Sequence, residues 1–187
     1  CDQEYLYLLN SNGNTLWRIS GEFVGCSISE NAALIASEDF DNTRYIFDKD
    51  GNQLWTYKHD PSVEIGQASG VSVSPNGEYI AFALNKMFGG GEKYGIALFK
   101  KSREEKFIRY LKGRFDNPVN VAVSNRGDVI FGTSIGNVYL LDLTGDIIWE
   151  YKLLSPSSIS DNAYVSISAD GRIFAINGNE KCCLYLR

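Results

Sequence analysis

The stretch VYLLDLTGDIIWEYK, from Val138 to Lys152, decides how the rest of the chain is interpreted. It contains an alternating apolar run, a short Thr-Gly-Asp turn, and a second run that closes on Trp149 and Tyr151. This pattern predicts a β-hairpin. Close copies begin at Tyr5 (YLYLLNSNGNTLWRI) and at Arg44 (RYIFDKDGNQLWTYK). A unit that recurs in this way indicates a repeat architecture.

A second repeated phrase lies between the hairpins. It begins at Val24 (VGCSISENAALIAS), Val71 (VSVSPNGEYIAFA), Val121 (VAVSNRGDVIFGT) and Val165 (VSISADGRIFAIN). Each copy predicts a short strand, a turn rich in Asn, Asp or Gly, and an apolar strand. We call the strands of this phrase a and b, and those of the hairpin c and d. The chain then consists of c-d, three a-b-c-d units and a final a-b-c.

Four-stranded units that recur roughly every 40–45 residues are typical of propeller blades. The a-b phrase, with Ser before the turn and Gly inside it, resembles WD-type repeats. The c-d hairpin, with Asp or Asn before the turn and Trp after it, resembles the repeats of pyrroloquinoline-quinone (PQQ)-type propellers. The resemblance implies an all-β fold, a β-propeller built of four-stranded antiparallel blades. Such a fold carries no particular activity with it.

The repeats divide the chain into one propeller domain or a portion of one. We expect a half blade at 1–20, blades at 21–60, 61–113 and 114–154, and a partial blade at 155–187. Three arrangements fit this division. A portion of a longer propeller is favoured, and the alternatives are a closed ring of four blades with one strand left over, and a dimer that closes eight blades.

One segment departs from the pattern. KKSREEKFIRYLK, which begins at Lys100, is rich in helix-forming residues and has apolar residues at helical spacing. Its place in the repeat instead predicts strand, turn and strand, with Phe99 equivalent to Phe47. In this register Ile108 takes the position of Trp55.

Composition limits the classes of partner. The chain has 18 Lys plus Arg against 23 Asp plus Glu, a net charge of −5, and no basic run. Nucleic acid and anionic membranes are therefore not expected as main partners. No apolar run approaches the roughly 18 residues of a membrane helix, so no membrane span is expected. A protein partner or a second copy of the chain is expected instead.

The cysteines raise a redox alternative. Cys1, Cys26, Cys182 and Cys183 match neither a zinc site nor a disulfide scaffold in number and spacing. Some quinoprotein dehydrogenases, whose blades carry similar Trp hairpins, place a disulfide between adjacent cysteines against the PQQ ring. Here the adjacent pair falls at the start of strand c, near Val138, where neighbouring side chains point to opposite faces. We therefore expect no cofactor and keep a quinoprotein-type redox enzyme as the alternative.

Location follows only from the resemblance. PQQ-type repeats are common in extracytoplasmic proteins, and the sequence begins with Cys1 rather than Met. The expectation is an extracytoplasmic or cell-surface protein, and a cytoplasmic location stays open. A structural subunit of a surface layer or filament is a further alternative.

The two ends of the blades differ in their connections. The a-b and c-d turns are short and repetitive, whereas the b-c and d-a connections vary in length and emerge at the opposite end, here called the loop face. Variable loops on a rigid scaffold are the usual place for binding. The predicted partner-binding residues, all on the loop face, are Glu38, Asp39, Asp41, His59, Asp60, Met87, Phe88, Arg114 and Asp116.

Within this set, Glu38, Asp39 and Asp41 place three carboxylates in one short exposed loop. A solvated acidic loop is the favoured interpretation, and a cation site is the alternative. His59 is the single histidine, so a two-histidine metal site is excluded within this chain. No nucleophile elbow accompanies it, which leaves no catalytic constellation. We therefore expect a non-catalytic binding scaffold rather than an enzyme.

Two groups of apolar residues have contrasting interpretations. Met87 and Phe88, beside a run of three glycines, are expected to form an exposed anchor for a partner. Trp17, Trp55 and Trp149 could form a stacking platform, but their regular place in the hairpin predicts packing between neighbouring blades.

Overall fold

The structure is a computed structural model that describes residues 4–58, 70–88, 91–111, 118–153, 162–178 and 181–186. For residues 85–88, 91–93 and 181–186 only the backbone is described. Every regular element in this part of the chain is a β-strand. None of the described residues therefore forms a helix that could cross a membrane. The strand groups predicted from the repeats are confirmed, because the strands form antiparallel sheets of two, four, four, four and three.

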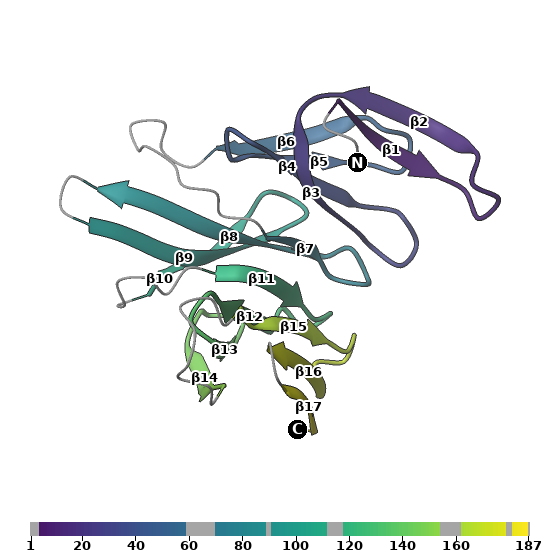
Figure 1. The fold of residues 1–187 in the computed structure, drawn as a ribbon. Coiled ribbons are helices and arrows are strands. Elements are labelled where there is room, and N and C mark those ends of the chain that lie inside the picture. The colour runs from purple at the N-terminus through teal and green to yellow at the C-terminus, as the bar shows by residue number, and fades with distance from the viewer. Residues whose placement is uncertain are drawn as a thin grey trace.

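We number these sheets one to five along the chain (Figure 1). Sheet 1 contains β1 (Tyr5–Leu9) and β2 (Thr15–Ser20). Sheet 2 contains β3 (Phe23–Ile28), β4 (Ile35–Asp39), β5 (Thr43–Phe47) and β6 (Gln53–Lys58). Sheet 3 contains β7 (Val71–Val73), β8 (Tyr79–Phe88), β9 (Gly91–Lys100) and β10 (Glu105–Tyr110). Sheet 4 contains β11 (Pro118–Val123), β12 (Val129–Thr133), β13 (Asn137–Leu141) and β14 (Ile147–Lys152), and sheet 5 contains β15 (Tyr164–Ile167), β16 (Ile173–Gly178) and β17 (Lys181–Leu186).

The sheets are arranged as propeller blades. In Figure 1 they follow one another in chain order, and the first and last sheets lie at opposite ends of the series. The first strands of sheets 2 to 5, which are β3, β7, β11 and β15, are neighbours in space. Sheets 2 to 5 therefore each present their first strand to a common inner side and their last strand outward. The predicted all-β propeller fold of four-stranded antiparallel blades is confirmed.

The c-d turns share one local structure. In sheet 2 the Asp48 carboxylate accepts the backbone N–H groups of Asp50 and Asn52, each at 2.9 Å. Gly51 adopts a φ of +84°, in the left-handed region that favours glycine. In sheet 3 Arg103 occupies this position with a φ of +71°. The same turn therefore forms there without a glycine, and the strand-turn-strand prediction for this segment is confirmed.

The structure corrects the position of the tryptophan equivalent in sheet 3. Trp55 pairs with Ile46 just after a β-bulge in β6. At the same distance from the turn in β10 stands Phe107, which pairs with Leu98. The expectation that Ile108 holds this position is therefore wrong by one residue. Two consecutive apolar residues made both registers plausible, and the equal length of the two turns decides between them.

The tryptophans of the hairpins in sheets 1, 2 and 4 each contact the sheet that follows. The indole Nε1 of Trp17 donates to the carbonyl oxygen of Lys49 in the turn of sheet 2, at 2.9 Å. Trp55 makes the equivalent bond, at 2.8 Å, to the turn of sheet 3. The ring of Trp149 meets Phe174 of sheet 5 edge-on, with the ring centroids 5.7 Å apart. The prediction that these residues pack between neighbouring blades is confirmed.

The core is divided among the junctions between sheets. Along β8, Ile80, Phe82 and Leu84 pack toward sheet 2, whereas Ala81 and Ala83 pack toward sheet 4. This division follows from the alternation of side chains along a strand. Because both faces of the strand are buried, its sequence from Ile80 to Leu84 is an uninterrupted apolar run.

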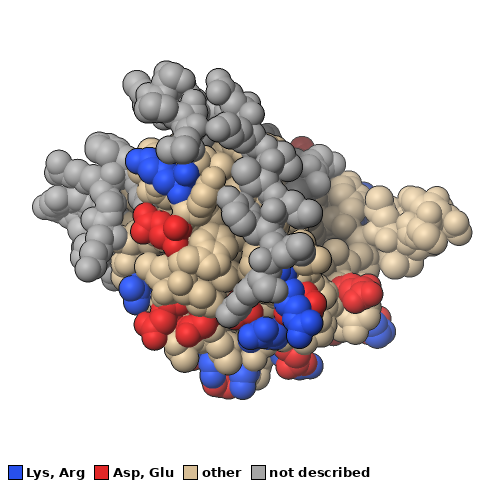
Figure 2. Space-filling view, turned by 90° about the horizontal axis from the view of Figure 1, so that it is seen from below, with Lys and Arg blue, Asp and Glu red and all other residues tan. Residues whose placement is uncertain are grey.

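Charged side chains of both signs share the surface. Figure 2 shows acidic and basic residues interspersed on the face seen from below, without a large continuous region of one sign. Several form exposed ion pairs, such as Lys101 Nζ with Glu78 Oε1 at 2.9 Å. Exposed pairs of this kind each contribute little to stability.

Candidate partner-binding pocket on the loop face

Glu38 is an interior residue, which corrects the expectation of three exposed carboxylates in one loop. It lies near the end of β4 and is 0% exposed. Its Oε1 accepts the backbone N–H of Gly70 at 2.9 Å, and its Oε2 lies 3.6 Å from Nε of Arg44. The reason is the side-chain alternation in β4, which turns Glu38 toward sheet 3 rather than toward solvent.

Arg44 completes this buried pair. Among the described residues that are fully buried it has the largest side chain. Its Nη1 donates to the carbonyl oxygen of Asn42 at 2.6 Å, and its Nη2 donates to that of Ala83, in the next sheet, at 2.7 Å. Glu38 Oε2 and Arg44 Nε have no hydrogen-bond partner among the described residues. The pair therefore fixes the β4–β5 turn, on the loop face, to sheet 3.

Burial dominates the protonation chemistry of this pair. It raises the pKa of Glu38, while the charge of Arg44 and the Gly70 N–H act in the opposite direction. It also lowers the pKa of Arg44, against the effect of the Glu38 carboxylate. In both cases the charged form is disfavoured because the side chain is removed from water.

We predict that Glu38 makes stability fall as the pH rises. Its pKa in the folded state is raised above the ordinary value of 4.5. Its contribution to stability is therefore fully present below the unfolded-state pKa and is lost as the pH rises through the folded-state pKa. Relative to Glu38→Gln, which cannot titrate, the wild-type free energy of unfolding should decrease from pH 4.5 toward neutrality. Urea unfolding of both proteins across this range measures the difference, and a constant or increasing difference would contradict the assignment.

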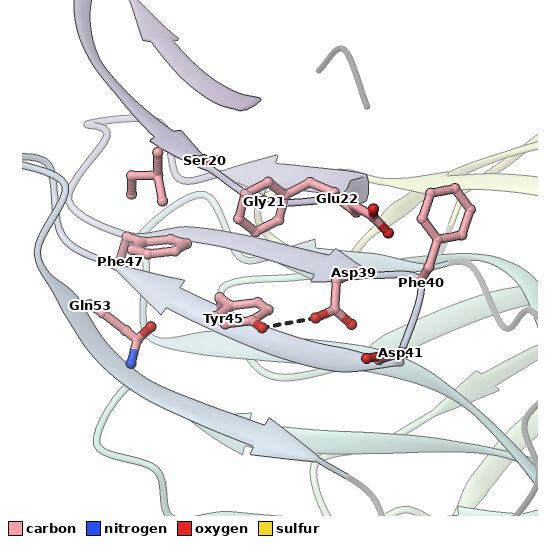
Figure 3. A pocket seen from close by; sticks show the side chains of 11 residues that line it. Ser20, Gly21, Glu22, Asp39, Phe40, Asp41, Tyr45, Phe47 and Gln53 are labelled. Atoms are coloured by element: carbon pink, nitrogen blue, oxygen red, sulfur yellow. Dashed lines mark hydrogen bonds between the residues drawn. The ribbon is translucent and has the colours of Figure 1, made fainter. Parts of the chain in front are cut away.

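A pocket of about 340 Å³ opens between sheets 1 and 2 on the loop face (Figure 3). The connection from β2 to β3, residues 20–23, forms one wall. The β4–β5 turn, residues 39–41, forms another, and Tyr45 and Phe47 of β5 line the groove between them. Ile19 and Gln53 complete the lining.

Tyr45 is more exposed than its equivalent in sheet 4. Tyr45 and Tyr139 hold equivalent places, since each pairs across to the second strand of its own sheet. Tyr139 is only 7% exposed and belongs to the core that includes Ala81 and Ala83 of β8. Tyr45, beside the two-stranded sheet 1, is half-buried and lines the pocket.

The acidic groups of the pocket gather at one end. In Figure 3 the side chains of Glu22, Asp39 and Asp41 lie on the same side as the ring of Phe40, whereas Gln53 lies at the other end. Phe40 is 42% exposed. Within the described residues, no Lys or Arg is in an ion pair with these three carboxylates. The described residues contain no group of three or more His, Cys, Asp or Glu placed to hold a metal ion.

Asp39 is held in place by its own neighbours. Its Oδ1 accepts the backbone N–H of Thr43 at 2.8 Å, and its Oδ2 accepts the hydroxyl of Tyr45 at 2.8 Å. Burial and this hydrogen bond raise the pKa of Tyr45, so its hydroxyl stays protonated and keeps donating. The Asp39 carboxylate is therefore oriented before any ligand arrives.

The structure brings together two of the predicted partner-binding residues. Asp39 and Asp41 line the pocket. Glu38 lies on the other face of β4, as described above. The remaining loop residues of the prediction, His59, Asp60, Arg114 and Asp116, lie outside the described residues.

The predicted anchor at Met87 and Phe88 is corrected in its secondary structure. Both residues belong to β8 and pair with β9, Met87 with Glu92 and Phe88 with Gly91. Most of the expected long loop is therefore strand, because β8 and β9 stay paired up to Phe88 and Gly91. The side chains of Met87 and Phe88 lie outside the described part of the structure.

Sequence reasoning missed the aromatic part of the pocket. Phe40 stands between two aspartates in a variable loop, an exposed aromatic in a polar setting, and this pattern is a usable signal for a contact residue. Arg44 also carried a signal, because the equivalent places in later sheets hold Ile96 and Val138. No feature of the sequence singled out Glu22, since a single acidic residue in a short connection is common.

The sheets, turns and junctions define a β-propeller repeat protein whose repeats resemble those of the PQQ and WD types. The model of a PQQ-type family, described as outer membrane protein assembly factor BamB, matches residues 110–186, which hold β11 to β17. No curated protein matches the chain.

One similar solved structure is the complex of KlAtg21 with the coiled coil of AgAtg16. The TM-score is 0.76 at 13% sequence identity, and the alignment covers 98% of this chain and 59% of that chain. At this identity the likeness shows the fold alone. The chain thus spans less than two thirds of the length of the propeller that it matches.

Proposed function

We propose that this chain is a non-catalytic propeller scaffold that binds a protein partner through its loop face. The observation that carries the proposal is the pocket between sheets 1 and 2, with Asp39, Phe40 and Asp41 on its rim. The buried Glu38–Arg44 pair supports it, because a fixed turn loses little conformational entropy on binding.

The lining of the pocket favours binding over catalysis. It supplies carboxylates, aromatic rings, one hydroxyl of Ser20, one of Tyr45 and the amide of Gln53. None of the lining residues is His, Cys, Lys or Arg, so the described pocket offers no base-activated nucleophile of the usual kinds. Pockets with an apolar wall and a few oriented polar groups are typical of recognition sites.

Two comparisons agree with a protein partner. KlAtg21 is solved in complex with a coiled coil, and the matched family is described as outer membrane protein assembly factor BamB. These are properties of those proteins. For this chain a protein partner and an extracytoplasmic or cell-surface location are part of the proposal.

The test compares the two ends of sheet 2, the loop face and the end that holds the β5–β6 turn. The wild-type chain and a loop-face variant, Phe40→Ala with Asp41→Lys, are used as baits in an extract of the source organism. The matched control is Leu54→Ala with Asp50→Lys, which makes the same kinds of change in the β5–β6 hairpin at the opposite end. Leu54 is 49% exposed, so its truncation leaves the core intact.

We expect the loop-face variant to capture at least about tenfold less of a discrete partner than the wild type does, because it lacks an aromatic anchor and carries a reversed charge. The control variant should retain it. Equal capture by the wild type and the loop-face variant, or loss only with the control, would contradict a partner site on the loop face.

A further inference from the structure

We propose that the pocket between sheets 1 and 2 binds an arginine side chain that the protein partner presents. This inference rests on the proposed function and names the chemistry of the group that its loop face recognises. It is carried by three features of the pocket, namely the sign of its charge, the shape of its aromatic wall and its size.

The charge of the lining is of one sign. Glu22, Asp39 and Asp41 contribute three carboxylates, and no described cation neutralises them. The nearest buried cation on this strand, Arg44, is directed to the other face of the sheet, where Glu38 and Ala83 hold it. A cationic guest therefore enters a region of negative charge and displaces none of the ion pairs that the described residues form.

The aromatic wall presents one partly exposed ring, that of Tyr45. The rings of Tyr45 and Phe47 are nearly parallel, with an interplanar angle of 8° and centroids 6.2 Å apart. Phe23 meets Tyr45 edge-on at 5.6 Å, which fixes that ring from the side. Because Phe47 is only 2% exposed, a planar cation can stack on the ring of Tyr45 alone, and guanidinium groups do so more readily than ammonium groups.

Size and geometry select arginine. A volume of about 340 Å³ lies near the lower limit for ligand pockets and suits one long side chain rather than a folded segment. The apolar stem can follow Ile19, which is partly exposed, while the head reaches the acidic end. Asp39, already oriented by Thr43 and Tyr45, offers a carboxylate to which a planar guanidinium can bind through two N–H donors.

The test is a titration of the whole chain with N-acetyl-arginine amide, followed by ¹H–¹⁵N NMR. We expect saturable shifts at the amides of Phe40 and Asp41, with a Kd of about 1 mM, because one residue supplies few contact atoms. N-acetyl-citrulline amide has a similar shape without the charge and should cause no saturable shift. N-acetyl-lysine amide should bind several-fold more weakly than the arginine compound.

Charge variants locate the binding. Glu22→Gln with Asp41→Asn should weaken the arginine compound by about tenfold. Asp146→Asn, a change at a side chain that is 82% exposed in sheet 4, should leave it unchanged. Equal binding of the citrulline compound, shifts confined to other sheets, or no effect of the double variant would each overturn the inference.

The arginine titration and the partner-capture experiment can fail independently of each other. If the arginine compound fails to bind while the loop-face variant still loses its partner, the pocket chemistry is wrong and the binding face stands. If it binds while partner capture is unaffected by the loop-face variant, the pocket recognises arginine but is not the partner site.

Discussion

Replacing Arg44 with alanine is expected to lower the free energy of unfolding by about 3–5 kcal/mol, among the largest effects of any single change in this chain. The substitution leaves the Glu38 carboxylate buried without its cation and frees the carbonyl oxygens of Asn42 and Ala83. It also removes a large side chain from a fully buried position. Urea unfolding, followed by tryptophan fluorescence, measures the loss.

A second variant separates the charge effect from the packing effect. Sheet 3 holds Ala83 and Ile96 at the places that Glu38 and Arg44 occupy in sheet 2. The double variant Glu38→Ala with Arg44→Ile copies this apolar arrangement. It should recover most of the loss and lie within about 2 kcal/mol of the wild type, since no buried charge remains.

The residual loss has an identified source. Glu38 Oε1 accepts the Gly70 N–H, and loss of this hydrogen bond lowers the free energy of unfolding by about 1 kcal/mol. If the double variant were as unstable as Arg44→Ala, the loss would come from packing rather than from an unpaired buried charge. The interpretation of the pair as an electrostatic lock between sheets 2 and 3 would then be wrong.

Gly132→Ala is expected to destabilise the chain by about 2–3 kcal/mol. A Cβ built on Gly132 would overlap the carbonyl oxygen of Ala163 and lie 2.6 Å from its carbonyl carbon. Because this neighbour is backbone, it cannot move aside by a change of rotamer. Ala163 is fully buried and its N–H donates to the Thr133 carbonyl at 3.0 Å, so any shift also strains that bond between sheets 4 and 5.

The matched control for this prediction is Gly178→Ala. The nearest described atom to its Cβ would be Cδ1 of Leu153, at 2.8 Å, and that side-chain end can rotate away. Thermal unfolding should therefore show a change within about 1 kcal/mol for the control. Equal effects of the two substitutions would mean that sheet 5 does not pack on Gly132 as described.

Much of the fold was predictable because it is repeated. Two phrases recur, and their turn residues stand at fixed offsets, so the grouping of the strands followed directly from alignment of the copies. The error at Ile108 arose where the repeat lacks its tryptophan. There Phe107 and Ile108 are both apolar, and hydrophobicity alone does not fix a register of one residue. The structure resolves it because Phe107, like Trp17, packs against the turn glycine of the next sheet.

The site was less predictable, for two physical reasons. Whether Glu38 faces solvent depends on which residue ends strand β4, and element boundaries are the least certain part of a sequence pattern. The pocket itself depends on a junction between sheets, so Phe40, Tyr45 and Glu22 come together only through packing. Asp39 and Asp41 were placed on the loop face by the sequence because they belong to a variable connection on a regular scaffold, and both line the pocket.

The most direct test of the account is a site-specific cross-link in the extract of the source organism. A photo-reactive phenylalanine analogue replaces Phe40 on the loop face and, in a second protein, replaces Arg172 in an a-b turn at the opposite end. The account predicts one discrete cross-linked protein from position 40, which excess wild-type chain removes and excess Phe40→Ala, Asp41→Lys chain does not. Cross-linking of that protein only from position 172, or equal competition by both chains, would contradict a partner site on the loop face.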